Sequence, residues 1–306
     1  MAFVTAAILN SLRTAFRADF QNALQTVDPQ YSQVATVVPS TTKSNTYGWL
    51  GSMPGFREWI GDRVMNSIKE HGYSITNKTF ESSIAVNRDD IEDDNLGIYK
   101  PMVQELAREG AEFPDELVFA LLASGWANTC YDGQYFFDTD HPVNSAHDGT
   151  GTDASVANVL VNGSYTGEPW YLLDTSRAIK PLIWQNRRNL ALTTLFNPDD
   201  PAVFTSNEFQ FGADLRGNAG YGFWQMAFGV KDDLNATNLW AAWKAMRAFT
   251  RDGGKKLKIR PTLLVVPASL EEAATKLLER DLLVENGAAV NNELKGKVKL
   301  LVADAL

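Results

Sequence analysis

Cysteine and long apolar runs are almost absent from this sequence of 306 residues. Cys130 is the single cysteine, which excludes an internal disulfide and any metal or iron–sulfur site built from several cysteines, and it fits a reducing cytoplasm. No segment reaches the roughly 18 consecutive apolar residues of a membrane-spanning helix. Residues 1–16 carry no basic stretch ahead of an apolar run, as a secretory signal would. We therefore expect a soluble protein with no membrane contact.

Positive charge is scarce as well. The chain has 28 Lys and Arg residues against 37 Asp and Glu residues, a formal net charge of −9. A protein that grips nucleic acid over a broad face needs cations to displace counterions from phosphates, so this balance disfavours tight DNA binding. One basic cluster stands out, and we interpret it as a solvated turn. It consists of Arg251, Lys255, Lys256, Lys258 and Arg260.

Common catalytic motifs are missing too. The chain has no Walker, H-E-x-x-H or G-x-S-x-G sequence. The glycines at 217, 220 and 222 do not match a dinucleotide-binding pattern, and we interpret them as turn glycines. The acidic run at 89–94 lacks the residue order of a calcium loop. These absences favour a protein without catalytic, cofactor or metal sites.

One cluster could still carry chemistry, because carboxylates and imidazoles bind zinc or transfer protons. It comprises Asp138, Asp140 and His141, with His147 and Asp148 close behind. The spacing matches no specific motif, and the segment is rich in turn residues. We expect these side chains to make local hydrogen bonds. A metal-assisted hydrolase that uses Asp138, Asp140 and His141 is kept as an alternative.

The composition, 44% hydrophobic and 21% charged, is that of a folded globular protein. Apolar residues recur every four positions near the start, which predicts an amphipathic helix that stops near Asp28 and Pro29. These residues are Ile8, Leu12, Phe16, Phe20 and Leu24. Residues 28–46 are rich in Ser, Thr and Pro, and we expect them to form an extended arm or linker.

The segment after the arm mixes four glycines with large apolar side chains, which is unusual for a plain surface loop. Its large side chains include Trp49, Met53, Phe56 and Trp59. From Tyr73 to Val86 the pattern alternates with a period of two residues, as in a strand. Residues 47–86 therefore predict a long projecting hairpin.

A helix is predicted after the acidic run, because acids are favoured at a helix N-terminus. Its apolar stripe is predicted at Ile98, Met102, Leu106, Leu117, Leu121 and Leu122. Pro114 predicts a break or kink near Phe113, since proline lacks a backbone N–H and clashes with the preceding turn.

The C-terminal half predicts loops and short strands at 131–168, then strands at 190–196 and 221–230. A helix through Leu239 to Phe249 should end at the glycines 253 and 254. A strand at 262–266 should precede a helix that starts with a capping box of Ser269 and Glu272. Alternation at 295–300 predicts a final strand with one wet face. The irregular mixture of helices and strands indicates an α+β fold.

Three blocks of sequence resemble those of the Mu-like phage major head subunits. The first is FESSIAVNRDDIEDD at 80–94, the second is DG at 132–133 followed by FFDTDHP at 136–142, and the third is RPTLLVVP at 260–267. Their order and spacing agree along nearly the whole chain.

This resemblance implies the Hong Kong 97 (HK97) type of capsid fold. It implies an N-terminal helix and arm at 1–46, an extended loop at 47–83, a peripheral domain with a spine helix at about 84–170, and an axial domain at about 171–306 whose strands return to the peripheral domain. The apolar loop would then reach over a neighbouring subunit. Candidate contact residues are Trp49, Met53, Phe56, Arg57 and Trp59.

The implied function is that of a major capsid protein, which forms hexamers and pentamers of an icosahedral phage head around double-stranded DNA. The expected partners are further copies of the chain, a separate scaffold protein, a portal protein and a possible decoration protein, with only weak contact to packaged DNA. The expected location is the virion, after assembly in the host cytoplasm. An encapsulin-like compartment shell is the other alternative.

Overall fold

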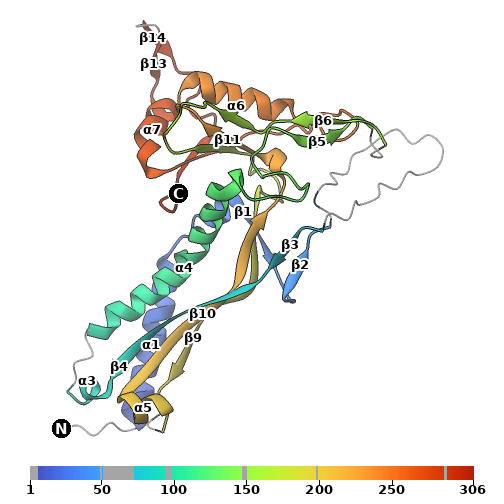
Figure 1. The fold of residues 1–306 in the computed structure, drawn as a ribbon. Helices are drawn as coiled ribbons and strands as arrows, with labels where there is room; N and C mark the ends of the chain where they lie inside the picture. Colours follow the sequence, from blue (N-terminus) through green and yellow to red (C-terminus); the bar gives the residue numbers. More distant parts are fainter. Residues whose placement is uncertain are drawn as a thin grey trace.

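The computed structural model describes residues 6–48, 50, 72–93, 98–146, 150–197, 199–285 and 288–306. The fold is α+β: a long arm of twisted sheet and helices leads to a more globular unit that carries a second sheet (Figure 1). No helix among the described residues is both long enough and apolar enough to cross a membrane.

The arm is built on a four-stranded sheet in the order β1-β9-β10-β4. Its strands are β1 (Ala35–Pro39), β9 (Leu182–Leu195), β10 (Glu208–Tyr221) and β4 (Lys78–Asn87). β1 runs parallel to β9, and the other two pairs are antiparallel. Alternate residues of β10 are buried, as expected for a sheet with one covered face.

Two long helices cover the arm, α1 (Ala6–Thr26) and α4 (Tyr99–Ala123). Phe16 of α1 packs edge-on against Phe211 of β10 with ring centroids 5.0 Å apart, and Lys100 of α4 forms an ion pair with Asp19 of α1. Together they enclose a second, separate hydrophobic core that lies along the arm. The predicted N-terminal helix is confirmed.

Some residues of the predicted apolar stripes are exposed, and other residues of the two helices face the core. On α1, Leu9 is buried and Ile8 is exposed. On α4, Ile98 and Met102 are exposed, and Leu117 and Leu121 are only partly covered, whereas Leu106 and Leu122 are buried as predicted. The remaining buried positions of α4 are Tyr99, Val103, Ala107, Pro114, Val118 and Phe119. The periodicity located both helices, but the faces that meet the sheet are set by packing.

The break predicted at Pro114 is wrong, because α4 continues through it. Neighbouring contacts hold the helix on both sides of the proline. Phe113 packs on Phe80 of β4 with ring centroids 4.7 Å apart, and the Asp115 carboxylate accepts the backbone N–H groups of Gln30 and Tyr31. An interior proline costs about 3 kcal/mol, which these tertiary contacts offset.

The extended segment predicted at 28–46 is a different feature from the sheet-and-helix arm. It is mostly regular structure: α2 (Tyr31–Val34), β1 and β2 (Ser44–Thr46). Pro29 lies outside the strand, as argued from its missing donor, and Pro39 is the last residue of β1. The segment is not a linker because β9 supplies backbone hydrogen-bond partners along β1.

Most of the projecting hairpin predicted at 47–86 lies outside the described residues; β3 (Ser74–Thr76), within it, pairs with β2, which lies just before it. Residues 78–83, within the extended loop expected at 47–83, belong to β4 and pair with β10. α3 (Arg88–Glu92) follows β4, with Asn87 as its N-cap and Asp89 and Asp90 in its first turn. The predicted helix is α4, whose first turn carries no acidic residue, so the prediction that these acids begin it is wrong: they lie in the separate short helix α3.

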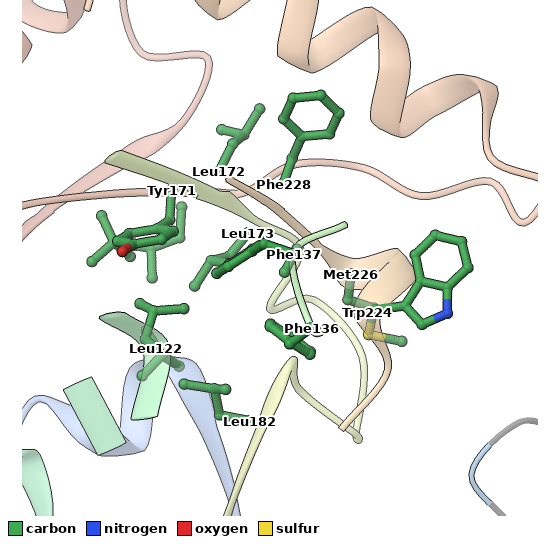
Figure 2. Close-up of a cluster of buried hydrophobic side chains, with 14 of the residues drawn as sticks. Leu122, Phe136, Phe137, Tyr171, Leu172, Leu173, Leu182, Trp224, Met226 and Phe228 are labelled. Atoms are coloured by element: carbon green, nitrogen blue, oxygen red, sulfur yellow. The ribbon is translucent and has the colours of Figure 1, made fainter. Parts of the chain in front are cut away.

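The globular unit contains a five-stranded sheet in the order β15-β12-β8-β11-β7. The strands are β15 (Lys299–Val302), β12 (Leu263–Val266), β8 (Trp170–Leu173), β11 (Ala227–Lys231) and β7 (Val159–Val161), and helices α6 (Ala236–Ala248) and α7 (Glu271–Glu279) pack on it. All four residues of central β8 are buried. Figure 2 shows that Leu122 of α4 and Leu182 of β9 join the same apolar cluster, so arm and unit share a core.

Several predicted strands of the C-terminal half are displaced. Residues 221–230 are divided between the end of β10, the 3-10 helix η3 (Trp224–Met226) and β11. Gly217 and Gly220 lie within β10 and are not turn glycines. The final strand begins at Lys299, after a turn. The division expected at residue 170 falls inside the central sheet, because β7 and β8 belong to one sheet with β11.

The strand at 263–266 and the helix α7 after it are confirmed, but the capping box is wrong. The chain first makes a 3-10 turn, η4 (Ala268–Leu270), so Leu270 is the N-cap and offers no side-chain acceptor. Ser269 donates to Glu168, and Glu272 forms an ion pair with Lys276. α6 ends at Ala248, and Gly253 and Gly254 adopt positive φ in the turn beyond it.

The remaining elements are small. The described residues of 131–168 form loops and short strands as predicted, among them the pair of β5 (His141–Asn144) and β6 (Asp153–Val156). A second hairpin joins β13 (Leu282–Glu285) and β14 (Ala288–Asn291). α5 (Pro201–Ser206) connects β9 to β10, and η2 (Ser124–Trp126) ends α4.

Candidate assembly surfaces

The predicted contact residues of the extended loop lie outside the described residues. They are Trp49, Met53, Phe56, Arg57 and Trp59. The structure does describe the β2–β3 stem on either side of this segment of sequence, and the two buried residues Tyr47 and Leu50 beside it. We call the β2–β3 stem, together with Tyr47 and Leu50, the anchor.

A buried polar network fixes this anchor to the main sheet. The Tyr47 hydroxyl donates to Gln185 Oε1 at 2.7 Å, and Gln185 Nε2 donates to the carbonyl of Ile75 at 2.9 Å and to Asn77 Oδ1 at 2.8 Å. Asn77 in turn donates to Ser40 Oγ at 2.9 Å. Burial raises the pKa of Tyr47 to about 12, so its hydroxyl keeps the proton that it donates.

This network was not predicted from the sequence, in which one weak signal indicates it. Gln185 is fully buried, in a run of apolar residues that opens β9. A lone amide within an apolar strand suggests a specific partner, because buried polar groups are hydrogen-bonded. Its partner Tyr47 is 138 residues away in sequence, beyond the reach of local patterns.

Large apolar side chains are exposed at the far end of the arm, where α3, α5 and the beginning of α4 lie (Figure 1). Phe204 of α5 is 92% exposed. Its neighbour Val203 is buried and anchors the short helix to β10, so the Phe204 ring is presented on a supported element. Leu195 at the end of β9, and Ile98 and Met102 at the start of α4, are also exposed. Such a concentration of apolar surface is typical of a protein contact.

The candidate metal cluster does not converge as a set. Asp138 accepts the backbone N–H groups of Tyr135 and Thr139, as expected for a turn residue, and Asp140 is an exposed surface residue. His141 is fully buried, with its ring stacked on Trp224 at a centroid distance of 4.0 Å. His147 and Asp148 lie outside the described residues.

His141 instead meets Cys130 and Asp132, a grouping that the sequence analysis did not predict. Potential ligand atoms of the three residues lie within 4.8 Å of one another. The Asp132 carboxylate is 2.8 Å from His141 Nδ1 and accepts the Cys130 thiol at 3.0 Å. Burial raises the pKa of the Cys130 thiol, with a further contribution from Asp132. A metal would require the thiolate, so the geometry fits a hydrogen-bonded structural cluster better than a metal site.

Comparisons with known proteins agree along nearly the whole chain. The family described as "Mu-like prophage major head subunit gpT" matches residues 9–306. The chain is 52% identical over 303 residues to the major capsid protein of Escherichia phage Mu, covering 99% of both chains. It is 51% identical over 309 residues to the Mu-like prophage FluMu major head subunit of Haemophilus influenzae, covering 100% of both.

Solved structures show the same fold. The procapsid of bacteriophage JBD30 matches with a TM-score of 0.87 and 50% identity, covering 99% of this chain and 100% of that one. The JBD30 capsid matches with a TM-score of 0.78 and 38% identity, covering 99% of each chain. These matches confirm the HK97-type capsid fold, and the chain belongs to the family of Mu-like prophage major head subunits.

Proposed function

We propose that this chain assembles, as hexamers and pentamers, into the icosahedral head shell of a tailed bacteriophage and encloses its double-stranded DNA. The observation that carries the proposal is the agreement of the whole fold with a procapsid subunit at a TM-score of 0.87. The exposed apolar end of the arm supports it, because a single subunit does not cover Phe204. Neither an encapsulin-like shell nor a metal-assisted hydrolase is favoured by a specific observation.

Each part of the fold then has a role in the shell. We assign the four-stranded sheet with α1 and α4 to the peripheral domain, with α4 as its spine helix, and the five-stranded sheet with α6 and α7 to the axial domain. The β2–β3 stem is the base of the extended loop. The axial domain begins after α4, earlier than residue 171, because β7 and β8 are part of its sheet.

The proposed partners are other copies of the chain, a separate scaffold protein and a portal protein. A decoration protein is a further candidate, since one matching structure is a JBD30 capsid decorated with minor capsid protein trimers. The net charge of −9 supports weak contact with packaged DNA. The proposed location is the virion, after assembly in the host cytoplasm.

The test is assembly of the purified protein, alone and with its scaffold, followed by negative-stain microscopy and sedimentation. We expect rings, shells or tubes. A monodisperse monomer under every condition would overturn the proposal. The enzymatic alternative is tested with a triple variant, Asp138→Asn, Asp140→Asn and His141→Gln. Stoichiometric zinc in the wild type that disappears in this variant would support the hydrolase.

A further inference from the structure

A basic pocket of about 520 Å³ lies at the C-terminal end of α6. Its walls come from the last turns of α6 and from the segment that leads to β12, and they include two tryptophans, Trp240 and Trp243. No carboxylate lines it within the part of the chain that the structure describes. Five cations do: Lys244, Arg247, Lys256, Lys258 and Arg260.

These five cations are exposed at the surface of the subunit. None of them forms an ion pair with a described residue. The single acid between positions 244 and 260 is Asp252, and its carboxylate accepts the backbone N–H of Asn144. Lys258 also adopts a φ of +58°, a conformation that is unfavourable for a residue with a side chain. The pocket therefore presents concentrated positive charge to a ligand outside the subunit.

The other end of α6 carries the opposite charge. Asp232 and Asp233 precede its N-terminus. Glu168 lies near them, because all three carboxylates act on Tyr165: its pKa is raised by burial first and then by these negative charges. Among the described residues these acids pair with no cation. Asp232 accepts the Asn162 side chain, and Glu168 accepts the Ser269 hydroxyl. A helix of 13 residues is about 20 Å long, so acidic and basic ends are well separated.

We propose that the basic pocket receives the acidic end of the α6 region of a second copy, in a head-to-tail contact. The inference rests on the proposed function, because it concerns how subunits join. Two ends of opposite charge on one helix make a heterologous contact, and repeated heterologous contacts form a ring when the rotation between copies closes. The contact also offsets repulsion between subunits that each carry a net charge of −9, and it steers them into register.

A nucleic acid is the competing occupant, since cations and tryptophans also bind phosphates and bases. Charge complementarity favours the second copy. The acidic end of the same helix and the net charge of the subunit repel a polyanion, whereas both are satisfied when copies meet head to tail. The two occupants predict different outcomes when the charges of both ends are exchanged.

The experiment compares charge reversals in the full chain. The basic-end variant is Lys256→Glu with Arg260→Glu, and the acidic-end variant is Glu168→Lys with Asp233→Lys. Each should raise the protein concentration needed for half-maximal assembly about tenfold or more, because like charges then meet. A variant with all four changes restores opposite charges and should assemble within about threefold of wild type. The matched control is Arg13→Glu with Arg17→Glu on the exposed side of α1.

Sedimentation measures assembly, and thermal unfolding of unassembled subunits verifies that each variant is folded. Restored assembly in the fourfold variant supports the contact. The contact would be overturned in favour of a nucleic acid by two results together. The assembly defects of the two double variants would add in the fourfold variant, and binding of a labelled DNA oligonucleotide would be lost whenever the basic end is reversed. Wild-type assembly in both double variants would also overturn it, while leaving the proposed function intact. A wild-type protein that never assembles would overturn both this contact and the proposed function.

Discussion

At the scale of single residues, two strands of the arm approach closely because β10 has a glycine where a side chain would collide. A Cβ atom at Gly217 would lie 2.6 Å from the Gln185 carbonyl oxygen and 2.9 Å from the Trp184 ring. The pairing of β10 with β9 shifts register between Asp214 and Gly217, as at a β-bulge. Glycine at 217 therefore permits the bulge and the close approach of β9 together.

Gly217→Ala should destabilise the isolated subunit by about 1–3 kcal/mol, the usual cost of overpacking. Gly212→Ala is the matched control in the same strand, because its Cβ would meet only the rotatable Ser83 hydroxyl at 3.2 Å. That variant should be neutral or slightly stabilising. Urea unfolding of unassembled subunits measures both. Equal losses in the two variants would contradict the close contact at Gly217.

The Asp132 cluster predicts a particular pH dependence. Burial acts to raise the pKa of Asp132, but hydrogen bonds from His141 and Cys130 outweigh it and lower the pKa below the ordinary value. The unfolded chain thus binds this proton more readily than the folded chain. The contribution of Asp132 to stability is present above about pH 4 and is lost as pH falls through the lowered pKa.

Asp132→Asn should therefore lower the melting temperature near pH 7, and its difference from wild type should shrink below about pH 4. The control is Asp304→Asn, which changes an exposed aspartate and should have little effect at either pH. Melting curves of unassembled subunits at several pH values test this. A difference that stays constant down to low pH would show that Asp132 does not act through its charge.

At the scale of elements, the β2–β3 stem, which we propose as the base of the extended loop, is held to β9 by the hydrogen bond between Tyr47 and Gln185. The stem has only three residues in each strand, too few for independent stability. Its position thus depends on side-chain contacts with the main sheet.

Gln185→Leu should cost about 1–3 kcal/mol, because the Tyr47 hydroxyl and the Ile75 carbonyl lose a buried partner. Tyr47→Phe in the same background should cost little more, giving a coupling energy of about 0.5–3 kcal/mol in the double-mutant cycle. Tyr165→Phe, at an exposed hydroxyl that donates to the Glu168 carbonyl, is the control. Denaturant unfolding supplies the four free energies. Additive single effects would argue against a shared network.

At the scale of the whole molecule, the exposed end of the arm should matter for assembly and not for folding. Phe204→Ser should leave the melting temperature of the unassembled subunit nearly unchanged, because its side chain is 92% exposed. Shell yield should fall, since a buried interface aromatic commonly contributes about 2 kcal/mol or more. Val203→Ala, a buried neighbour, should instead lower subunit stability. Normal shell yield with Phe204→Ser would exclude this end of the arm as a contact.

For the proposed extended loop we also expect an effect on assembly and little effect on subunit folding. If Trp59 contacts a neighbouring subunit as the resemblance implies, Trp59→Ala should cost little in subunit folding and should reduce assembly. Sedimentation of assembled material and thermal unfolding of subunits separate the two effects. A large loss of subunit stability with intact shell formation would place Trp59 in the core of its own subunit.

The sequence by itself determined the family, and it located α1, α4, β12, α6 and α7. These elements carry strong local signals, such as the four-residue spacing of Leu12, Phe16 and Phe20, all of which are buried. It also supported the absence of a recognisable catalytic motif. Local periodicity reports on single elements, because side chains on one face of a helix or strand share one environment.

Only the tertiary structure decided how these elements combine. It showed that residues 208–221 form the strand β10 although they contain several glycines, and that β1 pairs in parallel with β9. It carried α4 through Pro114 and joined Tyr47 to Gln185 and Asp132 to His141. Each outcome depends on partners that are distant in sequence or on packing that offsets an unfavourable local preference. Local propensities of about 1 to 3 kcal/mol are small enough for such contacts to override.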